Sequence, residues 1–200
     1  DRIQNGSIIT GDRLDKVSSA KNTNTKLVTI GPAPKFELLN QDSLKITNET
    51  YKGKVYVLEF FFSTCPSICP KMNLSMLTIQ NKFFGNPNFG IVSITINPEH
   101  DTPKVLKSHR ELIGVTSKNW NFLTGDKDTI HKLSNEGFKL FAAQDKDEID
   151  GFSHSGLFAL IDQNGVVRSR KDKHGNPLFY YNGLEQESID MLIQDIKKLL

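Results

Sequence analysis

The sequence predicts an α/β fold built on a strand–helix–strand unit that is followed by a helix, a β-hairpin and a closing helix. Two near-continuous apolar runs, at residues 55–59 and 90–96, are typical of parallel strands covered on both faces. Between them, residues 72–79 carry apolar side chains at helical spacing. Farther along, Gln163-Asn164-Gly165 separates two apolar runs and indicates an antiparallel hairpin.

The other elements follow from local signals. A hairpin is predicted where two short apolar segments, residues 36–40 and 43–47, flank Gln41-Asp42. A short strand is predicted at residues 120–125. Asp101 or Thr102 can cap a helix that has Pro103 at its first position and runs to about residue 113. Residues 126–136 and 184–200 predict further helices, residues 156–162 and 166–169 the strands of the late hairpin, and residues 144–150 a solvated charged loop. This order is typical of thioredoxin-like folds, here with an added N-terminal β-hairpin and an inserted strand and helix.

Composition and charge indicate how the domain is organised and which classes of function are unfavourable. Residues 1–29 are polar and predict an arm or linker, whereas residues 30–200 predict one thioredoxin-like domain. Twenty-five basic and 23 acidic residues leave a net charge of +2 with no basic stripe, which argues against nucleic-acid binding. No apolar run approaches the ~18 residues that span a membrane. Because the chain starts at Asp1, we expect a trimmed form from which any signal or anchor has been removed.

The two cysteines, Cys65 and Cys69, lie where a predicted core strand turns into a helix. A helix N-terminus favours the thiolate, which attacks disulfides and binds metals. Three uses compete: a buried structural pair, a redox dithiol with Cys65 as nucleophile and Cys69 as resolving thiol, and a metal site. The usual redox motif has two residues between its cysteines, whereas three separate them here.

Two thiolates and one imidazole form a ligand set that suits Cu(I) and tolerates Cu(II). His154 is the preferred third ligand because it precedes the strand at residues 156–162, which should neighbour the strand that leads to Cys65. His100, at the carboxyl end of residues 90–96, is the alternative. The remaining histidines fall in predicted helices or a charged turn, where solvated side chains are expected: His109, His131 and His174.

Four motifs carry a resemblance to a known family: FSTCPSICP at residues 62–70, PEHDTP at 98–103, WNFLTG at 120–125, and His154-Ser155 before an apolar strand. With these motifs, residues 30–200 resemble the Sco/SenC family of thioredoxin-like copper-binding proteins, which are assembly factors for cytochrome c oxidase. The resemblance implies a copper site formed by Cys65, Cys69 and His154. The chain departs from the family pattern at His100, where Arg is usual, and at Ser153, where Asp is usual; His100 is therefore a reserve ligand.

The resemblance also implies a function and a place in the cell. The expected role is a copper chaperone, with the copper-binding subunit of cytochrome c oxidase and other copper chaperones as partners. The expected compartment is the bacterial cell envelope, in the periplasm, with attachment through an N-terminal anchor that this sequence lacks. The alternative is a thiol:disulfide reductase that acts through Cys65 and Cys69 on the cysteines of a copper-protein partner. A peroxidase and a non-catalytic interaction module are weaker alternatives.

Overall fold

A mixed β-sheet forms the centre of the protein in the computed structural model, which describes residues 26–140, 142–144 and 152–200, without the side chains of 142–144 and 152–154. Within these residues, the sheet has nine strands in the order β1-β10-β9-β4-β5-β6-β2-β3, with β11 paired to β9, and β7 and β8 form a separate pair. The strands are β1 (Val28–Pro32), β2 (Glu37–Asn40), β3 (Lys45–Thr47), β4 (Val55–Phe61), β5 (Phe89–Thr95), β6 (Trp120–Thr124), β7 (Ala142–Gln144), β8 (Phe152–His154), β9 (Leu157–Ile161), β10 (Val166–Ser169) and β11 (Tyr181–Asn182). The helices are η1 (Asn48–Tyr51), α1 (Cys69–Lys82), α2 (Pro103–Leu112), α3 (Lys127–Lys132), the π-helical turn η2 (Leu133–Phe138) and α4 (Gln186–Leu199).

Strands β4 and β5 form the buried centre of this sheet. Every residue of both strands is buried, as their apolar runs predict. They pair in parallel up to Phe61 and Thr95, so their carboxyl ends meet at one edge. Strand β9 runs antiparallel on the other side of β4, with Leu58 opposite Ala159. The order β10-β9-β4-β5, with α1 between β4 and β5, confirms the thioredoxin-like fold.

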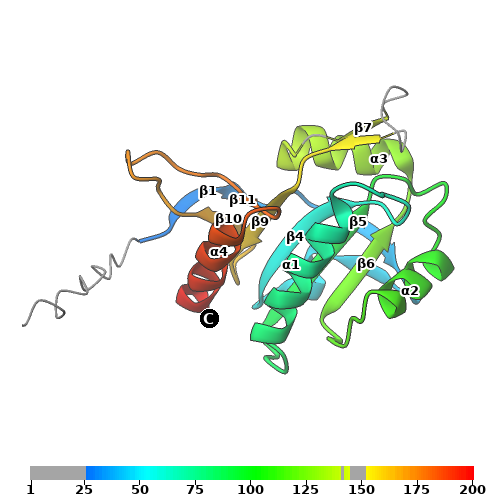
Figure 1. Ribbon diagram of the computed structural model, residues 1–200, viewed down its shortest axis with the longest axis horizontal. Helices are drawn as coiled ribbons and strands as arrows, with labels where there is room; N and C mark the ends of the chain where they lie inside the picture. Colours follow the sequence, from blue (N-terminus) through cyan, green and yellow to red (C-terminus); the bar gives the residue numbers. More distant parts are fainter. Residues whose placement is uncertain (1–25, 141, 145–151) are drawn as a thin grey trace, which may run out of the picture.

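The added elements extend this sheet beyond β5. Strand β6 is the inserted strand and pairs in parallel with β5. The predicted N-terminal hairpin is present as β2 and β3, and β2 pairs with β6. Figure 1 shows α1 running along the central strands, with α4 on one side of it and α2 on the other.

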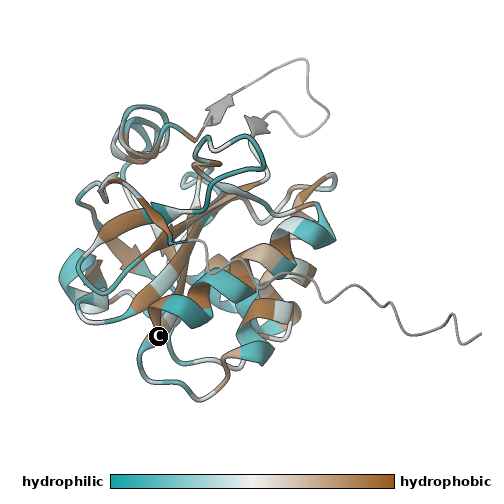
Figure 2. Ribbon diagram, turned by 90° about the vertical axis from the view of Figure 1, so that its left-hand side faces the viewer, coloured by the Kyte–Doolittle hydropathy of each residue, from teal (hydrophilic) through white to brown (hydrophobic). Residues whose placement is uncertain are grey.

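Helical periodicity places the core-facing side chains of α1. Cys69, Met72, Met76 and Ile79 are buried and recur every three or four residues along the helix. The two methionines are fully buried core residues, as expected of methionines on the inner face of a helix. Figure 2 shows the same division on a larger scale, with apolar residues in the central strands and polar residues on the outer helix surfaces.

A buried ion pair ties α4 to the sheet. Arg170 follows β10 and contacts Asp195 of α4 through two hydrogen bonds, Nε to Oδ2 at 2.6 Å and Nη2 to Oδ1 at 2.9 Å. The hydroxyl of Tyr181 donates to the same Asp195 carboxylate at 2.8 Å. The carboxylate is thus surrounded by donors, which compensates for its burial.

Several elements were not predicted from the sequence. Strand β1 begins at Val28, inside the segment predicted as an arm, because main-chain pairing with β10 holds it at the sheet edge. The pair β7–β8 was also missed, since it has no clear hydrophobic period. The helix predicted at residues 126–136 is present, divided into α3 and the π-helical turn η2. Residues 1–25 of the predicted arm and 145–150 of the predicted charged loop lie outside the described residues. In the described part of the chain, no helix has the length and apolar character needed to cross a bilayer.

Candidate metal centre

The two cysteines lie side by side where β4 leads into α1. Helix α1 begins at Cys69, so Cys65 lies in the loop that precedes it. The first turn still joins them, because the main-chain N–H of Cys69 donates to the Cys65 sulfur over 3.4 Å. Ser67 Oγ lies 3.6 Å from the same sulfur. The N-terminus of α1 therefore directs an N–H at the Cys65 sulfur, an arrangement that favours negative charge there.

The two thiols are not joined in a disulfide, and the pKa of one of them is raised. Cys65 is 7% exposed and Cys69 is 2% exposed, and neither forms a disulfide. The side-chain hydrogen bond with Cys65, followed by burial, raises the pKa of Cys69 far above its usual range. Cys69 therefore keeps its proton at neutral pH.

Asp101 holds the loop that leads to Cys65. Its carboxylate is fully buried and accepts the main-chain N–H of Ser63 at 2.9 Å, the Ser63 hydroxyl, and the Thr95 hydroxyl at 2.5 Å. Ser63 belongs to the cysteine loop, and Thr95 ends β5. A single carboxylate therefore links the cysteine loop to the neighbouring strand. The sequence predicted Asp101 or Thr102 as a helix cap; Thr102 caps α2, and Asp101 has this different role.

The reserve ligand His100 lies at the same sheet edge. Its Nδ1 lies 2.8 Å from Asp101 Oδ1 and 3.4 Å from Ser63 Oγ. The imidazole is half exposed, at 49% of its side-chain surface, and it does not line the pocket next to the cysteines. The structure thus engages His100 with the carboxylate that supports the cysteine loop.

The backbone of His154 also approaches this edge. His154 ends β8, and three residues later the chain enters β9 at Leu157. Because β9 is antiparallel to β4, the start of β9 lies beside the end of β4, from which the chain continues to Cys65. The topology therefore places the main chain at His154 and at Cys65 on the same edge of the sheet.

A pocket of about 400 Å³ opens beside the two cysteines, between α1 and α2. Leu74 and Leu77 of α1 and Leu112 of α2 contribute to its apolar walls. His109 lines it as well, which corrects the expectation of a solvated histidine: the ring is half-buried and stacks on Phe61. The helical period of α2 could have signalled this, since His109 lies three residues after the buried Leu106. The other two histidines differ, because His131 Nε2 hydrogen-bonds the carbonyl of Ile96 at 3.0 Å, whereas His174 is exposed.

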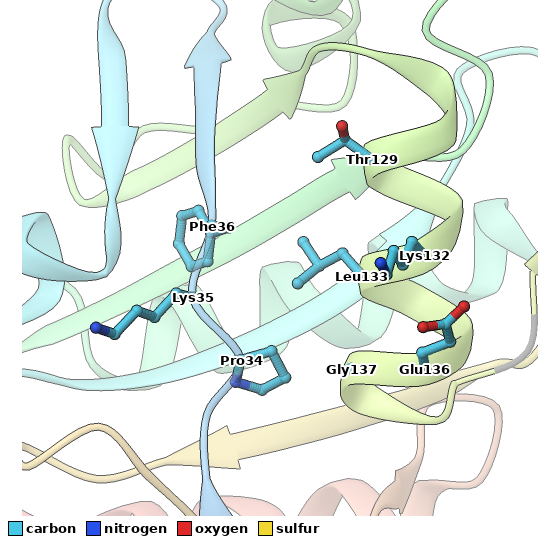
Figure 3. A pocket seen from close by; sticks show the side chains of 8 residues that line it. All are labelled: Pro34, Lys35, Phe36, Thr129, Lys132, Leu133, Glu136 and Gly137. Atoms are coloured by element: carbon cyan, nitrogen blue, oxygen red, sulfur yellow. The ribbon is translucent and has the colours of Figure 1, made fainter.

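A second pocket of about 400 Å³ lies away from the cysteines, between the segment that joins β1 to β2 and the helical turns α3 and η2 (Figure 3). Pro34 and Phe36 face Leu133 across it. Its lining contains no cysteine or histidine among the described residues. Among the side chains that the structure describes, no group of three His, Cys, Asp or Glu residues is arranged to hold a metal ion.

A buried carboxyl, Glu59, lies on β4, the strand that leads to the two cysteines. Ser93 Oγ donates to its Oε1 at 2.7 Å, and Trp120 Nε1 donates to Ser93 Oγ at 2.9 Å. The other oxygen, Oε2, is buried and has no hydrogen-bond partner among the described residues. Burial raises the pKa of Glu59 to about 7, against the lowering effect of the Ser93 hydrogen bond.

This pKa shift predicts how stability depends on pH. The ordinary pKa of this carboxyl is 4.5, and in the folded protein it is about 7. Between pH 4.5 and about pH 7, the folded protein therefore holds a proton on Glu59 that the unfolded chain releases. The free energy of unfolding should therefore fall as pH rises through this window, by on the order of 3 kcal/mol from this group. In Glu59→Gln that contribution is removed, so the variant should gain stability relative to the wild type between pH 5 and pH 8. Urea unfolding of reduced, metal-free protein at both pH values measures this, and parallel pH profiles would contradict it.

Comparison with known proteins identifies the family. The SCO1/SenC family profile matches residues 26–188. The SCO1 protein homolog of Bacillus subtilis (strain 168) is 33% identical over 164 residues, which cover 81% of this chain and 79% of the relative. The SCO2-like protein of Rickettsia felis is 33% identical over 168 residues, covering 78% of this chain and 73% of the relative.

Solved structures agree with this assignment. A SCO1/SenC family lipoprotein from Bacillus anthracis str. Ames superposes with a TM-score of 0.74 at 28% identity, covering 87% of this chain and 97% of that chain. BsSco, described as a member of the Sco family of cytochrome c oxidase assembly proteins, gives a TM-score of 0.72 at 29% identity, with 88% and 96% covered. Copper-bound ScoI of Bradyrhizobium japonicum, at 22% identity, shares the fold with a TM-score of 0.64 over 84% of this chain and 98% of that chain. The match over most of the chain and the relatives above 30% identity show that this chain belongs to the SCO1/SenC family.

Proposed function

We propose that this protein is a copper chaperone that binds copper through Cys65, Cys69 and His154 and helps to assemble the copper centre of cytochrome c oxidase. The observation that carries the proposal is the reduced, hydrogen-bonded pair of cysteines at the start of α1. The chain of His154 reaches the same edge of the sheet through β8 and β9.

The chemistry of these residues suits copper. Thiolates are soft ligands that favour Cu(I), and an imidazole adds a donor that both copper oxidation states accept. The N–H that α1 directs at Cys65 Sγ stabilises a sulfur that has lost its proton. Proteins of this fold are known with copper bound, as in ScoI of Bradyrhizobium japonicum, which supports the assignment of the metal.

The target and the compartment rest on the relatives. BsSco is described as a cytochrome c oxidase assembly protein, so we propose that the copper-binding subunit of that oxidase receives the metal. The relative from Bacillus anthracis is described as a lipoprotein, which supports a membrane-anchored protein of the bacterial cell envelope. Copper transfer would proceed by ligand exchange, with an incoming thiolate of the acceptor replacing one ligand of the donor.

Copper(I) titration of the reduced protein against a chromophoric chelator such as bicinchoninate tests the proposal. The wild type should bind one Cu(I) per chain, and His154→Ala should weaken binding by at least about tenfold because one of three ligands is lost. His100→Ala serves as the matched control and should change the affinity by less than about threefold, because His100 does not line the pocket beside the two cysteines. The chaperone assignment fails if the wild type binds no Cu(I), and the ligand assignment is wrong if the two histidine variants exchange behaviour.

The second candidate function is a thiol:disulfide reductase that acts on cysteines of a copper-protein partner. The raised pKa of Cys69 favours it, because the proton stays on Cys69 while Cys65 attacks. The Cys65 thiolate would attack one sulfur of the partner disulfide and release the other as a thiolate. Cys69 would then displace the partner, so that the partner gains two electrons and Cys65 and Cys69 end as a disulfide.

Trapping the mixed disulfide tests this alternative. In Cys69→Ser the intermediate cannot resolve, so a model peptide with a two-cysteine disulfide should accumulate on Cys65 and be visible by mass spectrometry. Cys65→Ser should form no such adduct. Equal adduct formation on both variants, or none on either, would remove the reductase function.

A further inference from the structure

The pocket beside the cysteines contains a histidine that the proposed copper site does not use. His109, on α2, shares the lining of this pocket of about 400 Å³ with Cys65 and Cys69. The rest of the lining is largely apolar, with Pro70, Leu77 and Ile113 among the contributing residues. The imidazole of His109 therefore adds a nitrogen of the type that binds copper to a pocket wall that also holds two thiols.

Two aromatic rings hold the imidazole in place. Its ring stacks on Phe61 with 5.6 Å between centroids and an interplanar angle of 25°. It meets Phe122 edge-on, with 5.9 Å between centroids and an angle of 72°. Both phenyl rings are buried, and Phe61 ends β4, the strand that leads to the cysteine loop. These contacts keep His109 beside the cysteine loop.

One ring nitrogen of His109 lacks a hydrogen-bond partner in the described part of the chain. Its Nε2 is buried and has no hydrogen-bond partner among the described residues. Buried polar atoms are normally paired, so an orphaned nitrogen calls for a partner that binds there. Burial lowers the pKa of His109, with the Asp101 charge acting in the opposite direction. At neutral pH the ring is therefore uncharged and carries a lone pair that a metal can accept.

Cu(I) is satisfied by as few as two ligands, and one thiolate with one neutral imidazole is a suitable pair. As the described side chains stand, Cys65, Cys69 and His109 do not form a three-ligand site. A two-ligand site made by one cysteine and His109 remains consistent with that finding, and the shared pocket has ample volume for one ion.

We propose that His109 is an auxiliary copper(I) ligand, which holds the metal together with a cysteine thiolate on the pocket side of the dithiol while His154 is disengaged. This inference rests on the proposed copper-binding function. Exchange between the two histidines breaks one copper–nitrogen bond as another forms, without change in the oxidation state of copper. Such an exchange would keep the metal on the protein while the His154 side of the site is free for an acceptor.

The test compares His154→Ala with the double variant His154→Ala/His109→Phe. Phenylalanine retains a ring against Phe61 and Phe122 but removes both nitrogens. We expect His154→Ala to keep measurable Cu(I) affinity in chelator competition and the double variant to lose at least a further tenfold. His154→Ala/His174→Phe is the matched control, because His174 is exposed on a distant turn, and it should behave like His154→Ala.

X-ray absorption of the copper-loaded variants gives a second readout. Imidazole scattering should remain in His154→Ala and disappear in the double variant, and His154→Ala/His109→Leu should repeat this result if the phenylalanine variant folds poorly. Retained imidazole scattering in a folded double variant, or equal affinity of the single and double variants, would overturn the role of His109 while leaving the proposed function intact. Failure of the wild type to bind Cu(I) would overturn both.

Discussion

Replacement of Cys69 by serine is expected to lower the Cu(I) affinity of the reduced protein by about 1,000-fold, or roughly 4 kcal/mol, because a hydroxyl is a poor ligand for a soft ion. Cys69 is nearly fully buried at the start of α1, and its main-chain N–H contacts the Cys65 sulfur. The serine side chain fits the same space, so the fold should be kept. Chelator competition measures the affinity, and circular dichroism monitors the fold.

Ser67→Ala is the matched control for this experiment. Ser67 Oγ lies 3.6 Å from Cys65 Sγ, so the variant alters the surroundings of the sulfur without removing a proposed ligand. We expect its Cu(I) affinity to stay within about threefold of the wild type, as is usual for a weak contact. If Cys69→Ser binds Cu(I) as tightly as Ser67→Ala, the dithiol is not the copper site.

Replacement of Asp101 by alanine should lower the free energy of unfolding by about 3–5 kcal/mol, because it leaves several buried donors without an acceptor. The carboxylate accepts from the main chain and hydroxyl of Ser63 and from Thr95, and it also contacts His100 Nδ1. Urea unfolding of the reduced, metal-free protein measures the loss. Asp101→Asn keeps one side-chain oxygen as acceptor and should lose less.

Asp126→Ala provides the comparison at an exposed site. Asp126 caps α3 by accepting the main-chain N–H of Thr129 at 2.8 Å. Loss of such a cap costs typically about 1 kcal/mol. A cost at Asp101 no larger than that at Asp126 would show that the buried carboxylate is not needed to hold the cysteine loop.

The central elements could be predicted because their signals are local. The apolar runs of β4 and β5, the spacing of Met72 and Met76 on α1 and the Gln163-Asn164-Gly165 turn all follow from residues that lie close together in the sequence. In that turn Gly165 has a φ of +74°, a conformation that glycine adopts without strain. The order of these elements along the chain then indicated a thioredoxin-like fold.

The missed features depend on contacts between distant segments. Strand β1 exists because Val28 and Pro32 pair with residues of β10 about 140 positions later, which no local pattern reveals. Burial lowers the pKa of His109, which lies on α2. The rings that bury it, Phe61 and Phe122, belong to two separate strands, β4 and β6. A helical histidine taken by itself predicts a solvated side chain.

The sequence by itself determined that a strand-to-helix turn with two cysteines stands at the centre of a thioredoxin-like fold, because period, turn residues and cysteine spacing are properties of neighbouring residues. Only the tertiary structure decided how this turn is supported and what lies beside it. Asp101 and His109 reach the cysteine loop from beyond β5, and parallel pairing of β4 with β5 is what brings these segments together. Long-range strand pairing and burial set the hydrogen bonds and the protonation of these groups, so their roles emerge only in the folded protein.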